Sequence, residues 1–217
     1  MKAIVFDMDG VLFDTERVCR DCWVTIAEKY GIRDMFEVFP LCIGRNRLGS
    51  GEVIREHYGD GFPYDEFREK ASQLFWKTLE EHGNPWKKGV KEILDFLKTE
   101  NWRVGLASST RRESVLRLLE KEGLKDYFSV VIGGDQIVNS KPAPDIYLLA
   151  CRELGVDPGE TFAVEDSYHG IRSAHRAGMR PIMVPDLLPA TEEMEGLCEV
   201  IKEDLLQVKE YLEHWQI

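Results

Sequence analysis

Long apolar runs are absent from this sequence of 217 residues. No uninterrupted apolar stretch approaches the roughly 18 residues that a membrane-spanning helix needs. After Met1 and Lys2 the chain passes straight into a short apolar segment, without the longer apolar region of a secretory leader. We therefore expect a soluble, cytoplasmic protein with no membrane partner.

Positive charge is also scarce in this chain. Its 28 Lys and Arg residues are outnumbered by 39 Asp and Glu residues, which gives a formal net charge of −11 at pH 7. A protein that binds a phosphate backbone normally presents a basic surface to it. The charge balance therefore argues against a nucleic-acid partner.

The five cysteines are few and odd in number. Cys19 and Cys22 form a C-x-x-C pair, but neither a second pair nor a nearby histidine completes the four ligands of a structural zinc site. Reduced thiols are the simpler account in a cytosolic chain. We expect reduced cysteines and no zinc site.

The chain is organised around its first apolar segment. With 43% hydrophobic residues, the sequence can fill the core of one large domain, or of one domain with an insertion. The segment Ala3–Phe6 predicts a short strand buried on both faces, and Asp7 and Asp9 follow it directly. Gly10 lets the chain turn sharply after this acidic pair. Ligands of open α/β sheets bind at such carboxyl ends of strands.

Residues 15–84 show helical periodicity and no strand pattern. Apolar residues three and four apart predict helices over 16–30, 47–58 and 64–83. We interpret 15–84 as a helical cap domain, inserted into a core that is formed by 1–14 and 85–217.

From residue 85 onward, strands alternate with helices. Helices are predicted over 90–97, 113–122, 145–154, 171–177 and 204–215, and strands over 102–107, 129–132, 161–164 and 181–184. Together with the first strand they predict an α/β fold: a doubly wound, Rossmann-like parallel sheet of five strands, covered on both faces and carrying the inserted cap.

Polar residues follow the other predicted strands. Ser108 and Ser109 precede a helix, Lys141 lies on a proline-rich turn, and Glu165 and Asp166 form a second acidic pair. Alone, each is also typical of an ordinary helix cap, a solvated lysine or a surface turn. If the two acidic pairs converge, carboxylates about 4 Å apart repel by roughly 4 kcal/mol at an effective dielectric near 20. Such a cluster needs a cation, and oxygen ligands of this kind suit Mg²⁺.

The four segments together resemble the haloacid dehalogenase superfamily, in the branch with a helical C1-type cap that includes β-phosphoglucomutases and sugar-phosphate phosphatases. The resemblance covers the whole length. It rests on the D-M-D-G stretch from Asp7, on Ser108 after an apolar strand, on the K-P-A-P-D stretch from Lys141, and on the E-D-S stretch from Glu165.

This resemblance implies a role for each matching residue. Asp7 is the implied nucleophile that accepts the phosphoryl group, and Asp9 the acid that protonates the leaving oxygen and then activates water. Ser108 and Lys141, with Ser109 beside them, are the implied phosphate-binding residues.

The same resemblance implies a Mg²⁺ site. Its ligands are Asp7, the backbone carbonyl of Asp9 and Asp166, with Glu165 close by or as a further ligand. The implied activity is Mg²⁺-dependent hydrolysis of small phosphate monoesters, with phosphorylated sugars or polyols favoured, through an aspartyl-phosphate intermediate.

Three other functions compete with that of a phosphatase. Dehalogenases of the superfamily lack an acid at the position of Asp9, because a halide leaves without a proton. A non-enzymatic receiver-like signalling module would be near half this length and would lack the cap. A phosphosugar mutase of β-phosphoglucomutase type is the closest rival, but Cys19 and Ala71 stand where such mutases carry a cap histidine and a cap lysine.

Glu16 and Arg47 are candidate substrate contacts in the cap. We expect a monomer that acts on a small-molecule phosphate ester.

Overall fold

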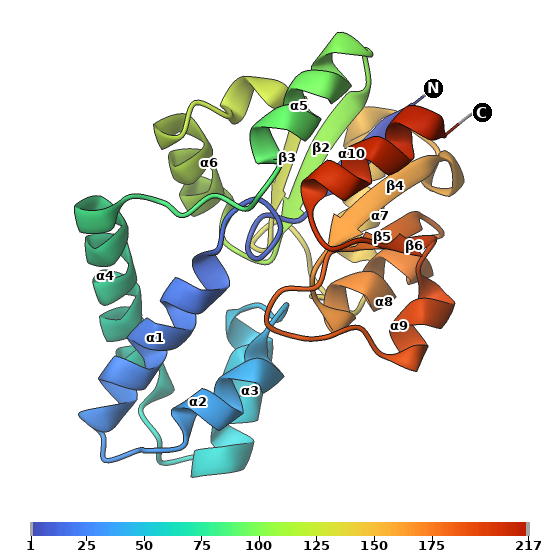
Figure 1. Ribbon diagram of the computed structural model, residues 1–217. Coiled ribbons are helices and arrows are strands. Elements are labelled where there is room, and N and C mark those ends of the chain that lie inside the picture. The colour runs from blue at the N-terminus through green and yellow to red at the C-terminus, as the bar shows by residue number, and fades with distance from the viewer. Residues whose placement is uncertain (1, 216–217) are drawn as a thin grey trace.

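The computed structural model describes residues 2–215, and a group of helices projects from a sheet that helices cover (Figure 1). The strands are β1 (Ala3–Phe6), β2 (Arg103–Ser108), β3 (Val130–Gly133), β4 (Thr161–Glu165), β5 (Arg180–Met183) and β6 (Val200–Ile201). The helices between the strands are α5 (Val90–Thr99), α6 (Arg112–Lys121), η2 (Lys125–Tyr127), α7 (Asp145–Leu154), η3 (Pro158–Glu160), α8 (Tyr168–Arg176), α9 (Glu192–Leu197) and α10 (Leu205–His214). The projecting helices are α1 (Thr15–Glu28), α2 (Met35–Val38), η1 (Phe39–Cys42), α3 (Arg47–Tyr58) and α4 (Tyr64–His82).

All strands of the sheet are parallel, in the order β3-β2-β1-β4-β5-β6. The predicted α/β class is therefore confirmed, but the predicted number of five strands is wrong. The sixth strand, β6, has two residues, which pair with Ile182 and Met183 of β5. A strand this short carries no periodicity by which the sequence could reveal it.

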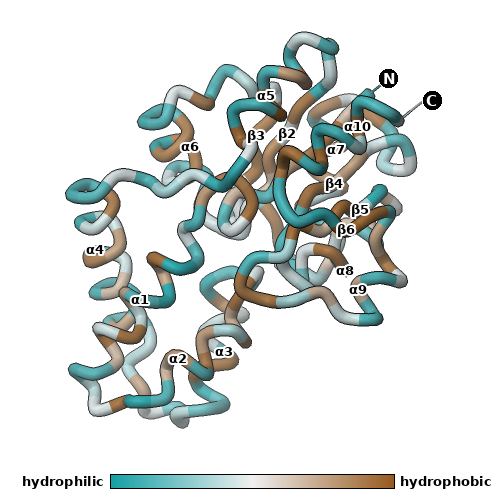
Figure 2. Tube along the Cα trace, in the orientation of Figure 1, coloured by the Kyte–Doolittle hydropathy of each residue, from teal (hydrophilic) through white to brown (hydrophobic). Residues whose placement is uncertain are grey.

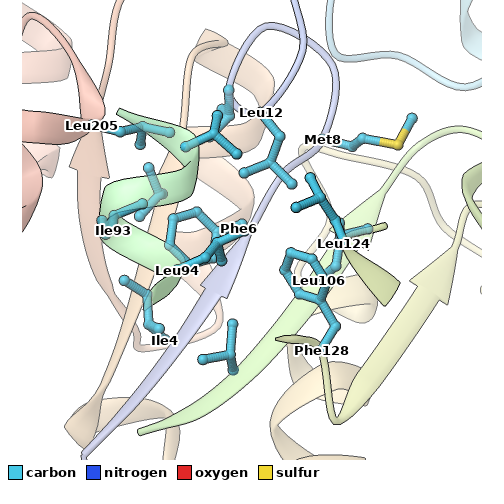
Figure 3. Packing of buried hydrophobic residues seen from close by; sticks show 14 of the residues in the cluster. Ile4, Phe6, Met8, Leu12, Ile93, Leu94, Leu106, Leu124, Phe128 and Leu205 are labelled. Atoms are coloured by element: carbon cyan, nitrogen blue, oxygen red, sulfur yellow. The ribbon is translucent and has the colours of Figure 1, made fainter. Parts of the chain in front are cut away.

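Alternate residues of the central strand β1 face opposite sides of the sheet. Ile4 and Phe6 belong to the hydrophobic cluster that α5 and α10 complete, and Figure 3 shows both side chains among residues of those helices. Val5 belongs to a separate cluster with α7 and α8 on the other face. Because both faces are buried, the strand reads as a continuous apolar run, and Figure 2 shows hydrophobic colouring gathered on the strands.

The helices α1–α4 pack around a hydrophobic cluster of their own. Trp23 of α1 lies at its centre, with its ring centroid 5.3 Å from those of Phe39 and Phe67 in edge-to-face geometry. Leu187 and Leu188, from the loop after β5, pack against this cluster. The main chain also crosses between the two groups of elements, since Asp14 N–H donates to Pro85 O at 2.8 Å.

Two local differences from the predicted elements have clear causes. Helix α8 begins at Tyr168 rather than at residue 171, because Ser167 caps it by accepting a hydrogen bond from Gly170 N–H at 3.1 Å. The short elements α2 and η1 were not predicted, since four residues hold barely one helical turn. Across residues 2–215, no helix has both the length and the apolar character needed to cross a membrane.

Candidate active site

The candidate site forms where three neighbouring strands end. Strand β1 lies between β2 and β4, with Phe6 in register with Leu106 and with Val164. Asp7, Ser108 and Glu165 therefore emerge at the same edge of the sheet, and all three are buried. This convergence can be predicted from the sequence, because all strands of a parallel sheet have their carboxyl ends at the same edge.

Lys141 binds the two acidic residues that leave the central strands. It reaches the site from the segment between β3 and α7 and is 3% exposed. Its Nζ donates to Asp7 Oδ1 at 2.7 Å, to Glu165 Oε1 at 2.6 Å and to Ala107 O at 3.2 Å. Tyr147 OH also donates to Glu165 Oε1, at 2.7 Å. Tyr147 was missed by the sequence analysis, where it reads as an ordinary apolar position of a helix.

The electrostatics of this cluster favour a further cation. Burial raises the pKa of Asp7 to about 8; Lys141 opposes this shift, while Glu165 and Asp9 add to it. Burial alone would lower the pKa of Lys141, but Asp7 and Glu165 outweigh burial and hold that pKa above its usual value. The lysine therefore stays charged at every physiological pH. One ammonium cannot offset the surrounding carboxylates.

Asp7, Glu165 and Asp166 together form a possible metal site. Each offers a carboxylate oxygen, and these oxygens all lie within 4.8 Å of one another. Burial, then Glu165 and Asp7, raise the pKa of Asp166 well above its usual value. Gly10 has a φ of +81°, and a Cβ there would lie 2.2 Å from Asp166 Oδ2, so only glycine fits beside this carboxylate. An all-oxygen, acidic donor set fits a hard dication such as Mg²⁺.

The carboxylate of Asp9 is held by hydroxyl groups rather than by the lysine. Thr15 Oγ1 donates to Asp9 Oδ1 at 2.5 Å, while Thr110 Oγ1 and Ser108 Oγ donate to Asp9 Oδ2 at 3.0 and 3.3 Å. Ser108 Oγ also accepts from Thr110 N–H at 3.1 Å. Thr15 and Thr110 were missed by the sequence analysis, because a hydroxyl at a helix start or in a turn carries no signal of its own.

Asp7 and Asp9 open into a cavity of about 370 Å³ between the sheet edge and α1–α4. Glu16, Arg47 and Ser109 also line it. This volume falls within the range of small-molecule sites, about 300 to 1,000 Å³.

Three of the sequence candidates have contacts that qualify their expected roles. Ser109 Oγ donates to Gly44 O at 3.1 Å, so its hydroxyl joins the cavity wall to the projecting helices. Arg47 lines the cavity, yet its Nη2 pairs with Asp65 Oδ1 at 2.5 Å. Burial, then Asp9 and Asp7, raise the pKa of Glu16 well above its usual value.

Cys19 and Ala71 both line the cavity as well. Burial raises the pKa of the Cys19 thiol far above its usual value, so the side chain is a neutral thiol. All five cysteines are free. Neither side chain can supply the charged or proton-transferring group that a histidine or a lysine would provide at the same place.

Comparisons with known proteins agree with this geometry. The chain is 34% identical over 186 residues to a phosphorylated carbohydrates phosphatase of Thermotoga maritima, covering 84% of each sequence. It is 30% identical to the fructose-1-phosphate phosphatase YqaB of Escherichia coli, over 84% of this chain and 95% of that one.

Solved structures show the same fold. The CbbY protein of Rhodobacter sphaeroides with bound phosphate has a TM-score of 0.80 at 27% identity and 96% coverage of both chains. A β-phosphoglucomutase of Clostridium difficile, at 24% identity, shares the fold with a TM-score of 0.84 over 98% of this chain and 96% of that one. The family described as haloacid dehalogenase-like hydrolase matches residues 1–178. The chain belongs to the haloacid dehalogenase-like hydrolases.

Proposed function

We propose that this protein is a Mg²⁺-dependent phosphatase that hydrolyses small phosphate monoesters through an aspartyl-phosphate on Asp7. One observation carries the proposal: Asp7 and Asp9 open into the same cavity, yet they have different partners. Asp7 contacts the buried ammonium of Lys141, and among the residues described the Asp9 carboxylate accepts hydrogen bonds from hydroxyl groups alone. Two carboxyl groups in different environments can divide the work of nucleophile and acid–base.

In the proposed first step, a carboxylate oxygen of Asp7 attacks phosphorus, and the bond from phosphorus to the ester oxygen breaks. Asp9 gives its proton to the departing alkoxide. Lys141 stays positively charged and holds Asp7 in place. Mg²⁺, when bound by Asp7, Asp166 and Glu165 with the backbone carbonyl of Asp9, supplies charge stabilisation to the phosphoryl oxygens.

In the second step, Asp9 acts as a base. Its carboxylate accepts a proton from water, and the hydroxide oxygen forms a bond to the phosphorus of the acyl phosphate. The bond between phosphorus and Asp7 breaks, which releases inorganic phosphate and restores both aspartates. Thr15 and Thr110, which bind opposite oxygens of the Asp9 carboxylate, fix its orientation for both proton transfers.

We further propose that residues 15–84 act as a cap over a core formed by 1–14 and 85–217. The separate hydrophobic cluster of α1–α4 supports this division, and so does a cavity lined from both sides. Sugars and polyols are the proposed leaving groups. The names of the relatives from Thermotoga maritima and Escherichia coli point to this class, and the cavity has suitable room.

Mutase activity is the second candidate, because β-phosphoglucomutase structures share this fold. A mutase must keep water from the acyl phosphate until a sugar hydroxyl arrives. The neutral Cys19 thiol and the methyl group of Ala71 offer no acid, base or cation for such coupling. We therefore expect water to reach the intermediate and hydrolysis to prevail.

Two assays run side by side test this function. Phosphate release is measured with Mg²⁺ on a panel that includes fructose 1-phosphate, glucose 6-phosphate and glycerol 3-phosphate. A coupled glucose 6-phosphate assay follows β-glucose 1-phosphate in the presence of the 1,6-bisphosphate. We expect phosphate release with little isomerisation; isomerisation much faster than hydrolysis would establish the mutase instead.

A further inference from the structure

Two arginines on the cavity wall have no part in the chemistry assigned to the aspartates. Arg45 lies in the turn between η1 and α3, and Arg68 lies in α4. Both line the cavity. They come from segments 23 residues apart that pack on the same hydrophobic cluster, so the fold itself brings them to one space.

Neither guanidinium has a carboxylate partner within residues 2–215. Arg45 Nε donates only to the backbone oxygen of Leu41, at 3.1 Å. Arg68 lies over the ring of Trp23, 5.0 Å from its centroid, and makes no ion pair there. Arg47, on the same wall, differs because Asp65 neutralises it. A partly buried guanidinium without an anion is costly unless a ligand supplies one.

Three acidic groups line the same cavity as these arginines: the thiol of Cys42 and the carboxyl groups of Glu16 and Glu69. Burial raises the pKa of Cys42 to about 11, although Arg45 and Arg68 both act to lower it. A neutral thiol does not offset the charge of these arginines at pH 7. Burial, with Asp9 and Asp7, raises the pKa of Glu16 above its usual value, and Arg68 opposes this shift. Within residues 2–215, neither Glu16 nor Glu69 forms an ion pair with these arginines, so both guanidinium groups remain available to an anionic ligand.

The space beside Arg68 is open to a ligand. Ala71 follows Arg68 by three positions in α4, so the two lie on one face of the helix, and both line the cavity. A methyl group there leaves the guanidinium unobstructed. Planar guanidinium groups bind carboxylate and phosphate oxygens through paired, charge-assisted hydrogen bonds.

We propose that Arg45 and Arg68 bind a second anionic group, a carboxylate or a phosphoryl group, on the organic part of the substrate. This inference rests on the proposed function, since the first phosphoryl group must lie at Asp7. It narrows the substrate class to phosphate monoesters of acidic sugars or to sugar bisphosphates. Neutral sugar phosphates are then the poorer substrates.

Two matched pairs of esters test the proposal. 6-Phosphogluconate and glucitol 6-phosphate share a six-carbon chain and differ in a carboxylate against a hydroxymethyl group. Fructose 1,6-bisphosphate and fructose 1-phosphate differ in a second phosphoryl group. We expect at least one charged member to exceed its neutral partner about tenfold or more in kcat/KM, and the pair that shows the larger ratio identifies the anion.

Single variants connect that preference to the two arginines. Arg68→Gln and Arg45→Gln should each reduce the ratio of charged to neutral kcat/KM by about tenfold, whereas Arg68→Lys should keep part of it. Arg33→Gln is the control, because it removes the same charge from an exposed position that does not line the cavity. Thermal unfolding shows which variants keep the fold.

Calorimetric binding to the Asp7→Asn variant separates this inference from the proposed function. If no ester of the panel releases phosphate, the proposed phosphatase activity fails, and tighter binding of the charged ester than of its neutral partner still supports the anion subsite. Equal kcat/KM values within both pairs and equal affinities overturn the subsite. So does an Arg68→Gln variant that loses the same factor on charged and neutral esters.

Discussion

At the scale of single residues, Asp7 is one of two carboxylates in direct contact with Lys141, at 2.7 Å. Asp7→Asn replaces the nucleophilic oxygen by an amide of nearly the same shape. We expect kcat for phosphate release to fall by at least about 1,000-fold, because the amide cannot form the acyl phosphate. Thermal unfolding should change little, since Lys141 keeps its bond to Glu165.

Asp60→Asn, an exposed control, should match the wild type. Substantial turnover by a folded Asp7→Asn variant would remove Asp7 from this role.

The partly buried side chain of His169 should make the stability of the fold depend on pH, and this effect can be measured without a metal ion. Its Nδ1 is buried without a hydrogen-bond partner among the residues described, and burial, with Arg45 and Arg172, lowers its pKa to about 4. In the unfolded chain the pKa is about 6.5. Between these values the unfolded state binds more protons, so stability falls as the pH is lowered through this window.

The matched variant is His169→Gln, compared with the wild type by urea unfolding at pH 7.5 and pH 5. Between the two pH values, the wild type should lose about 1 kcal/mol more unfolding free energy than the variant, a figure reduced because the ring is partly exposed. Parallel losses in the two proteins would mean that His169 titrates normally in the fold.

At the scale of elements, the turn before α3 joins the projecting helices to the sheet edge. Gly44 has a φ of +74°, and a Cβ there would lie 2.5 Å from Ser167 Oγ. Gly31, after α1, has a φ of +75° with nothing within 4 Å of such a Cβ. An alanine at Gly31 would introduce backbone strain alone, whereas an alanine at Gly44 would add a steric clash with Ser167. Comparing the two variants therefore separates these effects.

We expect Gly44→Ala to lower kcat/KM about tenfold or more, because the turn must move away from Ser167 and widen the cavity. Gly31→Ala should keep kcat/KM within about twofold while losing about 1 kcal/mol of stability from the same strain. Steady-state kinetics and urea unfolding of both variants provide the measurement. Equal kinetic effects would show that contact at Ser167 is unimportant for the site.

The sequence predicted the elements that are long and periodic. Helix α3 has the predicted bounds, and β1, β2 and β4 lie where apolar runs indicate strands. The two-residue β6 and the six-residue α9 escaped, because their formation depends on contacts with β5 and α8 rather than on local pattern.

The sequence likewise predicted some residues of the candidate site and not others. Asp7, Lys141, Glu165 and Asp166 come together as strand ends predict, whereas their catalytic roles remain predictions. Thr110, Tyr147 and Arg68 could not be singled out, because only the tertiary fold turns them toward the site. Each of the three is a common residue type whose role depends on its neighbours.

At the scale of the whole molecule, Asp186 connects the two groups of elements. It follows β5, and its Oδ1 accepts hydrogen bonds from Arg17 of α1 at 3.1 Å and from Lys87 at 2.7 Å. Asp14, at the start of α1, also pairs with Arg17, at 3.1 Å. These ion pairs lie where the chain leaves the sheet and where it returns, and they join α1–α4 to the core beside the packing of Leu187 and Leu188.

Metal binding should stabilise the whole molecule, because the acidic cluster at the sheet edge is under-compensated without it. Lys141 supplies one positive charge to three buried carboxylates, Asp7, Glu165 and Asp166. An ion that binds only the folded state adds about 2.7 kcal/mol at 100 times its Kd, which for a chain of this size corresponds to a rise of about 5 to 10 °C in Tm. We therefore expect millimolar Mg²⁺ to raise both Tm and phosphate release. Asp166→Ala should lose most of both effects, and in excess chelator its Tm should equal or exceed that of the wild type, because it removes a buried carboxyl group whose ionisation is disfavoured by burial and by its acidic neighbours. Asp60→Ala, which removes an exposed carboxylate, should keep the full response to Mg²⁺.

Full turnover by the wild type in excess chelator would show that activity does not depend on a metal in this cluster. An equal Mg²⁺ shift in the Tm of Asp166→Ala would likewise show that the cluster does not hold the metal.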